Sequence, residues 1–309
     1  MEGTRPRTAS SIGMFDMLKG AGMLTIVFAH TAELYPMQSV SGLSLTAFFP
    51  FIYREALMAA FFIASGYGFR KRSIHKCIHQ QLKSLLKPYL YTALFTCVLH
   101  FIIHYKTFQY LPGTIGESIK VTGGFLLGLP HTAEYFGQEF FSCGPMWYLL
   151  ALMVGWVLLD VILNIFPERY VPWAVAGCVL LGWGASLVWE LPFCLIQGAV
   201  VVPYLYIGFL AKRHHLLDEP LPRRLFAGLL AATVLIAVGA LATRTTDCIS
   251  LAEWSLGPLS IFLDGAAGLL FIRLFMRLSR GHGPIVRFLE AVGRRSLNIF
   301  CVHTVEIIA

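Results

Sequence analysis

The sequence predicts an all-α fold, a polytopic transmembrane helical bundle with about nine or ten membrane segments. Its 309 residues are 57% hydrophobic and only 13% charged, which is too little charge for the surface of a soluble protein of this length. Apolar runs of near-spanning length recur along the whole chain, and no long hydrophilic segment separates them. We therefore expect residues 1–309 to form a single transmembrane domain.

The first helix is expected over residues 14–34. Arg5 and Arg7 precede its apolar run, as basic residues precede the apolar part of a signal peptide. Asp16 and Lys19 interrupt the run, however, and no small-residue cleavage site follows. We expect this helix to be retained in the mature protein.

The remaining apolar runs predict further helices, and one run is too short for a clear assignment. The expected helices cover residues 47–69, 88–105, 145–166, 172–189, 196–211, 225–242, 256–278 and 296–309. Segment 121–130 has about half the length that a span needs, so it is either a re-entrant or tilted segment or a full crossing. The final run, 296–309, is also short, which favours a chain truncated at its C-terminus.

Basic residues gather between the apolar runs. The basic stretches are residues 70–87, 212–224 and 279–295. Cytoplasmic loops carry an excess of Lys and Arg, so these stretches and the N-terminus are expected on the cytoplasmic side. The same rule explains the net charge of +7 without a nucleic-acid partner. The seven cysteines are scattered with no C-x-x-C pair, so we expect neither a bound metal nor a disulfide framework.

Ionisable residues line one face of the first helix. Lys19 and His30 are eleven positions apart, which is three turns plus about 20° on a helix and roughly 16 Å along its axis. Asp16 and Glu33 extend this face by steps of three residues. Because a charge facing lipid is costly, such a stripe is expected to face the protein interior or a water-filled cavity.

Five motifs occur in order along the chain. They are D-x-L-K-G followed by V-x-x-H in residues 16–30, FFIASGYGF at 61–69, KSLLKPYL at 83–90, GPMWYLLAL at 144–152 and SLNIFCVH at 296–303. In this order they resemble the acyltransferase-3 family of integral membrane acyltransferases, and the resemblance covers essentially the whole chain.

The resemblance implies an O-acyltransferase of the bacterial plasma (inner) membrane. The acyl group, typically acetyl, would come from cytoplasmic acyl-CoA, typically acetyl-CoA, with no metal involved. It would pass to a hydroxyl of an envelope glycan or a related small acceptor on the outer side. Nothing in the sequence indicates an oligomeric state.

His30 is the expected catalytic residue, since acyl transfer to a hydroxyl needs a base that works near neutral pH. It would either deprotonate the acceptor or carry the acyl group as a covalent intermediate. Glu33 would orient His30 or bind the acceptor, although a solvated carboxylate fits equally well. Lys19 stands where the family usually has Arg, and would hold a CoA phosphate as a point charge. It would otherwise pair with Asp16 or anchor the helix at the interface.

Other candidates have both a functional and an ordinary explanation. Arg70, Arg72 and Lys87 would bind the phosphates of CoA, or are simply positive-inside charges. Trp147 and His303 match family motifs and would line the cavity, as would Asp16. An interfacial aromatic belt explains Trp147 as well, and helix packing explains His303.

A transporter or membrane sensor of the same fold is the alternative function. A polar stripe inside a helical bundle is equally what a substrate path requires. Transporters often contain paired halves with broken helices. The sequence shows no clear internal duplication, which favours the enzyme.

Overall fold

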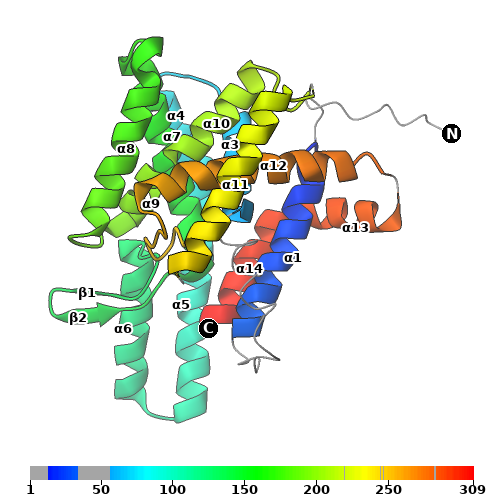
Figure 1. Cartoon of the computed structure of the whole chain (residues 1–309). Coiled ribbons are helices and arrows are strands. Elements are labelled where there is room, and N and C mark those ends of the chain that lie inside the picture. Colours follow the sequence, from blue (N-terminus) through cyan, green and yellow to red (C-terminus); the bar gives the residue numbers. More distant parts are fainter. Residues whose placement is uncertain (1–12, 34–55, 219, 244, 246, 282) are drawn as a thin grey trace. The chain divides into compact units, whose positions relative to one another are not determined.

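The structure is a computed structural model that describes residues 13–33, 56–218, 220–243, 245, 247–281 and 283–309 (Figure 1). The helices are α1 Asp16–Glu33, α3 Met58–Tyr67, α4 Ile74–Gln81, α5 Lys87–Phe108, α6 Leu111–Leu127, α7 Trp147–Ile165, α8 Val171–Ser186, α9 Leu195–Val200, α10 Val202–Arg213, α11 Arg223–Thr243, α12 Pro258–Leu278, α13 Pro284–Gly293 and α14 Ser296–Ile308. One antiparallel hairpin joins β1 Ala133–Tyr135 to β2 Gln138–Phe140. The predicted all-α class is confirmed.

Several of these helices can cross a membrane. In the described part of the chain, four are long and apolar enough, namely Ile74–Phe108, Gly144–Ile165, Arg223–Thr243 and Pro258–Leu278. A fifth span results if Pro192–Val200 and Val202–Arg213 count as one broken crossing. Met58–Tyr67 and Ser296–Ile308 are apolar but shorter. The described residues thus supply four or five full-length candidate spans of an integral membrane protein, besides shorter or less apolar helices.

The chain divides into two compact units. The first unit comprises residues 1–70, 203–248 and 253–296, and contains α1, α3 and α10 to α13. Within it, α1 packs along α13, while α12 contacts both α3 and α11. Glycines allow the closest of these contacts, because a side chain at such a position would collide with the backbone of the neighbouring helix.

The second unit comprises residues 71–202, 249–252 and 297–309. It contains α4 to α9, the β-hairpin and most of α14. α7 packs against α4, α8 and α9, and α5 and α6 form an antiparallel helical hairpin (Figure 1). The single-domain organisation expected from the sequence stays a prediction.

The α5–α6 hairpin has polar residues inside and apolar residues outside. Between its helices, His104 Nδ1 lies 3.0 Å from the hydroxyl of Thr114. Nearer its other end, the Tyr89 hydroxyl donates a hydrogen bond of 2.6 Å to the Phe125 carbonyl. Leu94 is one of many apolar residues exposed on the outside. This distribution suits a hydrocarbon environment, where polar groups must find partners within the protein.

Three expectations from the sequence need correction. Residues 121–127 of segment 121–130 are the end of α6, a helix of 17 residues that begins at Leu111 because Pro112 suits a first helical turn. Within basic stretch 70–87, residues from Ile74 onward are helical and continue through a π-helical turn at Leu82–Leu86 into α5. The ten-residue helix α13 lies within basic stretch 279–295.

Two further differences concern breaks in the chain. The expected helix 196–211 is interrupted between α9 and α10, where Pro203 supplies no backbone N–H. The expected helix 47–69 is seen as α3, and its first residues, 47–55, lie outside the described part of the chain. The β-hairpin was not expected from the sequence.

Candidate active site

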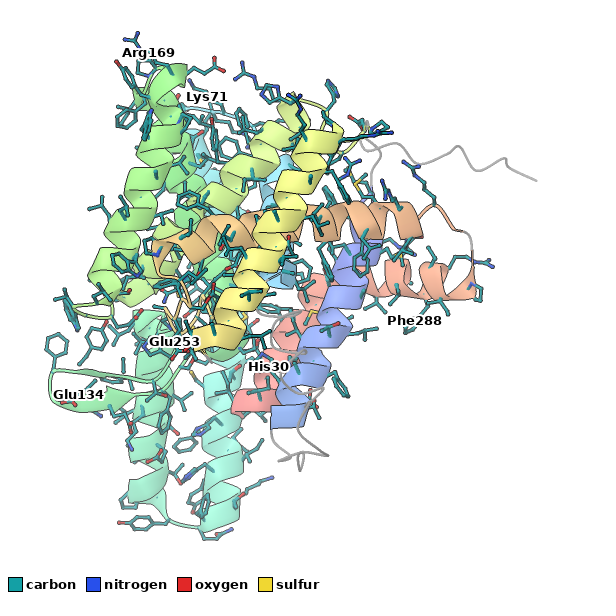
Figure 2. The ribbon with its side chains drawn as sticks, viewed as in Figure 1. His30, Lys71, Glu134, Arg169, Glu253 and Phe288 are labelled. Carbon is teal, nitrogen blue, oxygen red and sulfur yellow. The ribbon has the colours of Figure 1, made fainter. Side chains whose placement is uncertain are left out.

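α1 carries the ionisable residues that the sequence singles out (Figure 2). A stripe runs along it by steps of four, three and four residues through Lys19, Met23, Ile26 and His30. Met23 and Ile26 are buried, and the two ionisable residues at the ends of the stripe are half-buried. The most exposed large residue of α1, Phe28, points elsewhere. Lys19 and His30 therefore lie at the two ends of a helix face that the protein covers.

Lys19 has an acidic partner one turn away on the same helix. Its ammonium lies 3.6 Å from a carboxylate oxygen of Asp16, whose side chain is 11% exposed against 44% for Lys19. The pairing expected as one alternative is thus present. Since an ammonium has three N–H donors, Lys19 can still bind a second anion from its exposed side. Glu33 is the last residue of α1, and its side chain lies outside the described residues.

Two glycines fix α1 against α13. A Cβ added to Gly20 would lie 1.8 Å from the Leu289 carbonyl oxygen, and one added to Gly293 would lie 1.8 Å from the Asp16 carbonyl oxygen. On another side of α1, the ring of Phe15 makes an edge contact with Tyr67 of α3, at 5.5 Å between centroids. The helix that carries Lys19 and His30 is therefore held by contacts that leave little room for rotation.

The basic candidates near α4 and α5 are on the surface. Arg70 and Lys87 are exposed, and the Lys87 ammonium lies 5.7 Å from the centre of the Tyr91 ring. Arg72 is half-buried, and its backbone N–H donates a hydrogen bond of 3.0 Å to Asp160 of α7. Their exposure is compatible both with phosphate binding and with ordinary positive-inside charge.

Trp147 and His303 belong to the second unit. Trp147 is the first residue of α7 and makes an edge contact with Tyr148, whose ring in turn contacts Phe300 of α14. The side chain of His303 is buried, and its Nδ1 lies 3.4 Å from a carboxylate oxygen of the exposed Glu306.

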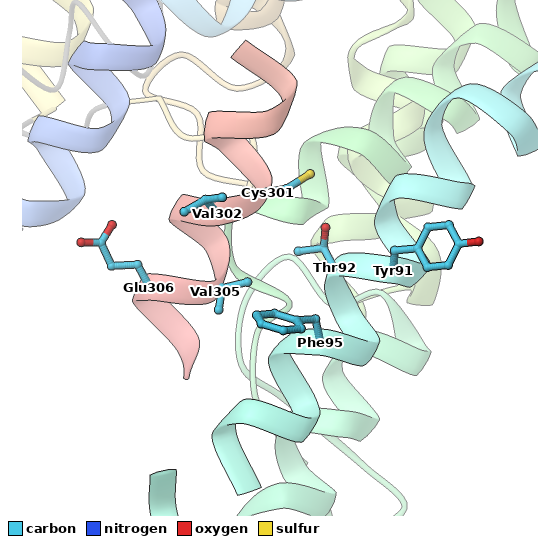
Figure 3. A pocket seen from close by; sticks show the side chains of 7 residues that line it. All are labelled: Tyr91, Thr92, Phe95, Cys301, Val302, Val305 and Glu306. Atoms are coloured by element: carbon cyan, nitrogen blue, oxygen red, sulfur yellow. The ribbon is translucent and has the colours of Figure 1, made fainter. Parts of the chain in front are cut away.

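A groove of about 410 Å³ lies beside His303, between α5 and α14 (Figure 3). Its lining is apolar apart from a few groups, and consists of Tyr91, Thr92, Phe95, Cys301, Val302, Val305 and Glu306. Thr92 and Phe95 face the α14 ribbon in Figure 3, and Glu306 points away from α5. His303 is not one of the lining residues, but its neighbours Val302 and Val305 on α14 are.

Of the predicted residues, Asp16 and Lys19 are brought into direct contact. Lys19 and His30 share a face but are separated by three helical turns, roughly 16 Å. Arg72, Lys87, Trp147 and His303 belong to the second unit. Among the described residues, no group of three or more His, Cys, Asp or Glu side chains is arranged to hold a metal ion.

Comparison with known families identifies the chain. A family model described as an acyltransferase domain matches residues 12–308, which include the described parts of both units. The chain belongs to the acyltransferase-3 family. Family membership and the apolar helices together indicate a membrane acyltransferase. No curated protein and no solved structure matches the chain.

Three buried acids on helices of this acyltransferase-3 chain were missed in the sequence. Asp160 in α7 and Asp264 in α12 lie within apolar spans, and Glu290 lies in α13. The position of Asp160 and Asp264 inside apolar runs could have revealed them. An intramembrane carboxylate is costly, so it usually has a structural or functional partner. Asp160 has such a partner, since it anchors the backbone at Arg72. Asn164 supports the same segment by donating a hydrogen bond of 2.8 Å to the Arg72 carbonyl.

Proposed function

We propose that this membrane acyltransferase moves an acyl group, most simply acetyl, from cytoplasmic acyl-CoA to a hydroxyl of a cell-envelope carbohydrate. The plasma membrane of a bacterium, with the N-terminus in the cytoplasm, is the proposed location. The covered face of α1 supports this proposal, because it has a half-buried cation at one end and a half-buried histidine at the other. An acyl-CoA donor has its phosphates far from its reacting thioester. It therefore needs a cation such as Lys19 at one point and a base or nucleophile such as His30 at another.

His30 would act at the reacting carbonyl. In direct transfer, its imidazole takes the proton of the acceptor hydroxyl, and the oxygen bonds to the thioester carbon. The carbon–sulfur bond then breaks, and the departing thiolate takes the proton back to give free CoA. In the covalent route, an imidazole nitrogen attacks the thioester carbon, the carbon–sulfur bond breaks, and CoA leaves as the thiol with the proton that the imidazole gives up. The acceptor hydroxyl then attacks the acyl-imidazole, the carbon–nitrogen bond breaks, and the hydroxyl proton returns to the imidazole. Glu33 would orient the imidazole in either route.

Lys19 would bind a phosphate or the pantetheine arm of the donor from its exposed side. Arg70, Arg72 and Lys87 would supply further positive charge for the phosphates. A lysine acts as a point charge without the two-pronged geometry of arginine, so Lys19→Arg is expected to keep donor binding. Trp147 and His303 would line the path of the donor or acceptor.

Replacing His30 tests the proposal. His30→Ala should lower acyl transfer by at least about a hundredfold, the usual contribution of a positioned acid–base group. Acetyl transfer from labelled acetyl-CoA to envelope glycans, read by mass spectrometry, measures this loss. His214→Ala is the matched control, since His214 is exposed outside α1. Full transfer by His30→Ala to every acceptor would refute the catalytic role.

A second measurement separates the two chemical routes. Intact-protein mass spectrometry after incubation with the donor alone should show an added acyl group that depends on His30 if the route is covalent. An unmodified protein that still transfers the acyl group when acceptor is added indicates direct attack.

Lys19 is tested by donor binding. Lys19→Ala should weaken acyl-CoA binding about tenfold or more, because a charge-assisted hydrogen bond contributes roughly 1.5–3 kcal/mol. Calorimetric titration of the purified protein with a non-reactive CoA analogue gives the affinity. If Lys19→Ala, Lys19→Arg and the unchanged protein bind the analogue equally, Lys19 serves only as the partner of Asp16.

The transporter alternative is supported by the interrupted helix between α9 and α10. Broken helices with exposed backbone groups are common at the substrate sites of transporters. A transporter should accumulate the hydroxyl-bearing substrate in sealed vesicles without any acyl donor. The acyltransferase should leave vesicle contents unchanged until acyl-CoA is supplied.

A further inference from the structure

A polar cluster joins three connecting segments and one helix of the second unit. The cluster consists of His131 after α6, Glu190 after α8, Gln197 on α9 and Ser250. The side chain of Gln197 is fully buried. Those of Glu190 and His131 are 10% and 28% exposed, so the cluster is open to one side at these two residues. It contains none of the residues in the proposed catalytic mechanism.

Hydrogen bonds fix the orientation of each group in the cluster. His131 Nδ1 lies 3.0 Å from the Ser250 carbonyl, and must carry a proton because a carbonyl only accepts. His131 Nε2 therefore faces a carboxylate oxygen of Glu190, at 3.6 Å. The Gln197 amide nitrogen lies 3.4 Å from the other Glu190 oxygen and 3.4 Å from the Ser250 carbonyl. Both neighbours are acceptors, which places the amide nitrogen on this side.

This orientation leaves one acceptor without a donor. The Gln197 amide oxygen is buried and has no hydrogen-bond partner. Burial raises the pKa of the Glu190 carboxyl, while His131 and the Gln197 amide lower it. A buried acceptor without a donor costs free energy comparable to a lost hydrogen bond. The cluster would therefore gain from a ligand hydroxyl that donates a hydrogen bond.

Aromatic rings adjoin the cluster and form what we call the aromatic shelf: Tyr135, Phe136 and Trp189. The Tyr135 hydroxyl donates a hydrogen bond of 2.5 Å to the Glu190 carbonyl. Its ring lies 5.5 Å from that of Trp189 and 6.4 Å from that of Phe136. Trp189 is 56% exposed and Phe136 is 97% exposed. Phe136 is at the turn of the β-hairpin, which Figure 2 marks by Glu134.

We propose that the cluster and the aromatic shelf bind an uncharged polyhydroxylated ring, such as a pyranose, as the acceptor of the acyl group. Hydroxyls both donate and accept, so they match a set made of an amide oxygen, a carboxylate and an imidazole. The flat rings of the shelf offer an apolar surface for the C–H face of a sugar. An anionic ligand would be repelled by the negative charge of the Glu190 carboxylate, which favours an uncharged ligand. As an acceptor site, the cluster rests on the proposed function, whereas sugar binding can be measured by itself.

Binding of uncharged sugars to the full-length protein in nanodiscs provides the test. The probes are glucose, galactose, N-acetylglucosamine and their disaccharides, followed by saturation-transfer NMR without any acyl donor. We expect saturable binding of at least one probe, weakened tenfold or more by Glu190→Gln and by Trp189→Ala. Trp173→Ala is the matched control, because Trp173 is also exposed, at 75% against 56% for Trp189, and lies on α8 outside the shelf. Trp189 is a surface residue, so its variant should fold even if a cluster variant does not.

The outcomes separate this site from the proposed function. Sugar binding that persists in a His30→Ala protein supports the site even if no acyl transfer is found. Acyl transfer whose acceptor KM is unchanged by Glu190→Gln and Trp189→Ala overturns the site and leaves the function standing. Variants that lower only the unfolding temperature mean that the cluster is a structural tie between loops. Preferential binding of a choline probe, or no binding of any sugar, also overturns the proposal.

Discussion

The α1–α13 pair of the first unit and the α5–α6 pair of the second unit are held together by different means. In the first unit, α1 and α13 approach until the backbone of each helix fills the space beside a glycine of the other. In the second unit, the α5–α6 hairpin joins its helices through polar side chains, at His104 with Thr114 and at Tyr89 with Phe125. Both arrangements replace the hydrophobic effect, which contributes little between helices that are already surrounded by lipid.

This difference predicts which of the two helix pairs tolerates amino-acid substitution at its contact. A glycine contact is defined by excluded volume, so any side chain must push the helices apart. A polar contact is one hydrogen bond among other interactions, so its loss has a limited cost. The helix with the proposed catalytic histidine uses the less tolerant arrangement, as expected if the position of His30 must be held closely.

The largest effect is expected at Gly20. In Gly20→Ala the new methyl group would overlap the Leu289 carbonyl oxygen, which should destabilise the protein by about 3 kcal/mol or more, at the upper end of overpacking. Thermal unfolding in detergent measures this. Gly228→Ala in α11 is the control, because a Cβ there meets nothing within 4 Å and the helix should gain up to about 1 kcal/mol. Equal unfolding temperatures for the two variants would contradict the claim that the α1–α13 contact has no room for a side chain at Gly20.

An intermediate effect is expected at Asp160, a polar anchor of the second unit. Asp160→Leu removes the acceptor of the Arg72 N–H, and an unsatisfied buried donor costs about 1–3 kcal/mol. Asp160→Asn keeps a side-chain oxygen and should retain most of the stability. Comparing the free energies of unfolding of the two variants by chemical denaturation shows how much of the loss comes from the missing hydrogen-bond acceptor. If Asn is as damaging as Leu, the charge and not the hydrogen bond holds this segment.

The smallest effect is expected at Thr114. Thr114→Val removes the contact with His104 and should cost about 0.6 kcal/mol, the average for hydrogen bonds between membrane helices. Thr304→Val is the matched control, because Thr304 of α14 is as fully buried as Thr114. Both hydroxyls donate to the carbonyl four residues back in the chain, and the Thr114 hydroxyl also lies 3.0 Å from His104 Nδ1. The difference between the two variants in reversible unfolding therefore isolates the bond between α5 and α6, and a loss of several kcal/mol would contradict a tolerant hairpin.

Much of the helical architecture could be predicted because apolar runs are a strong local signal. The first helix was expected over 14–34 and is found as Asp16–Glu33. α13 was missed because Arg287 and Glu290 made a short helix look like a charged loop. The β-hairpin was missed because its turn has positive φ at Phe136 and Gly137, where the usual sequence signal is Asn-Gly.

The candidate site could be predicted only along a single helix. The shared face of Lys19 and His30 follows from helical periodicity, which sequence spacing contains. The cluster around Glu190 was beyond such reasoning, since its residues come from segments up to 119 positions apart, as between His131 and Ser250. Chain folding and not periodicity brings these groups together.

The helix that runs without interruption through α4 and α5 has a length that matters for the membrane. Its 35 residues measure roughly 50 Å, against a hydrocarbon layer of about 30 Å. Tilting within the usual limit of about 40° accounts for only part of the excess. At least one end must therefore extend into the headgroups or the water beyond them. Lys76, Lys83 and Lys87 make the α4 end the natural one, so the helix would present a row of cations on a rigid support at the membrane surface.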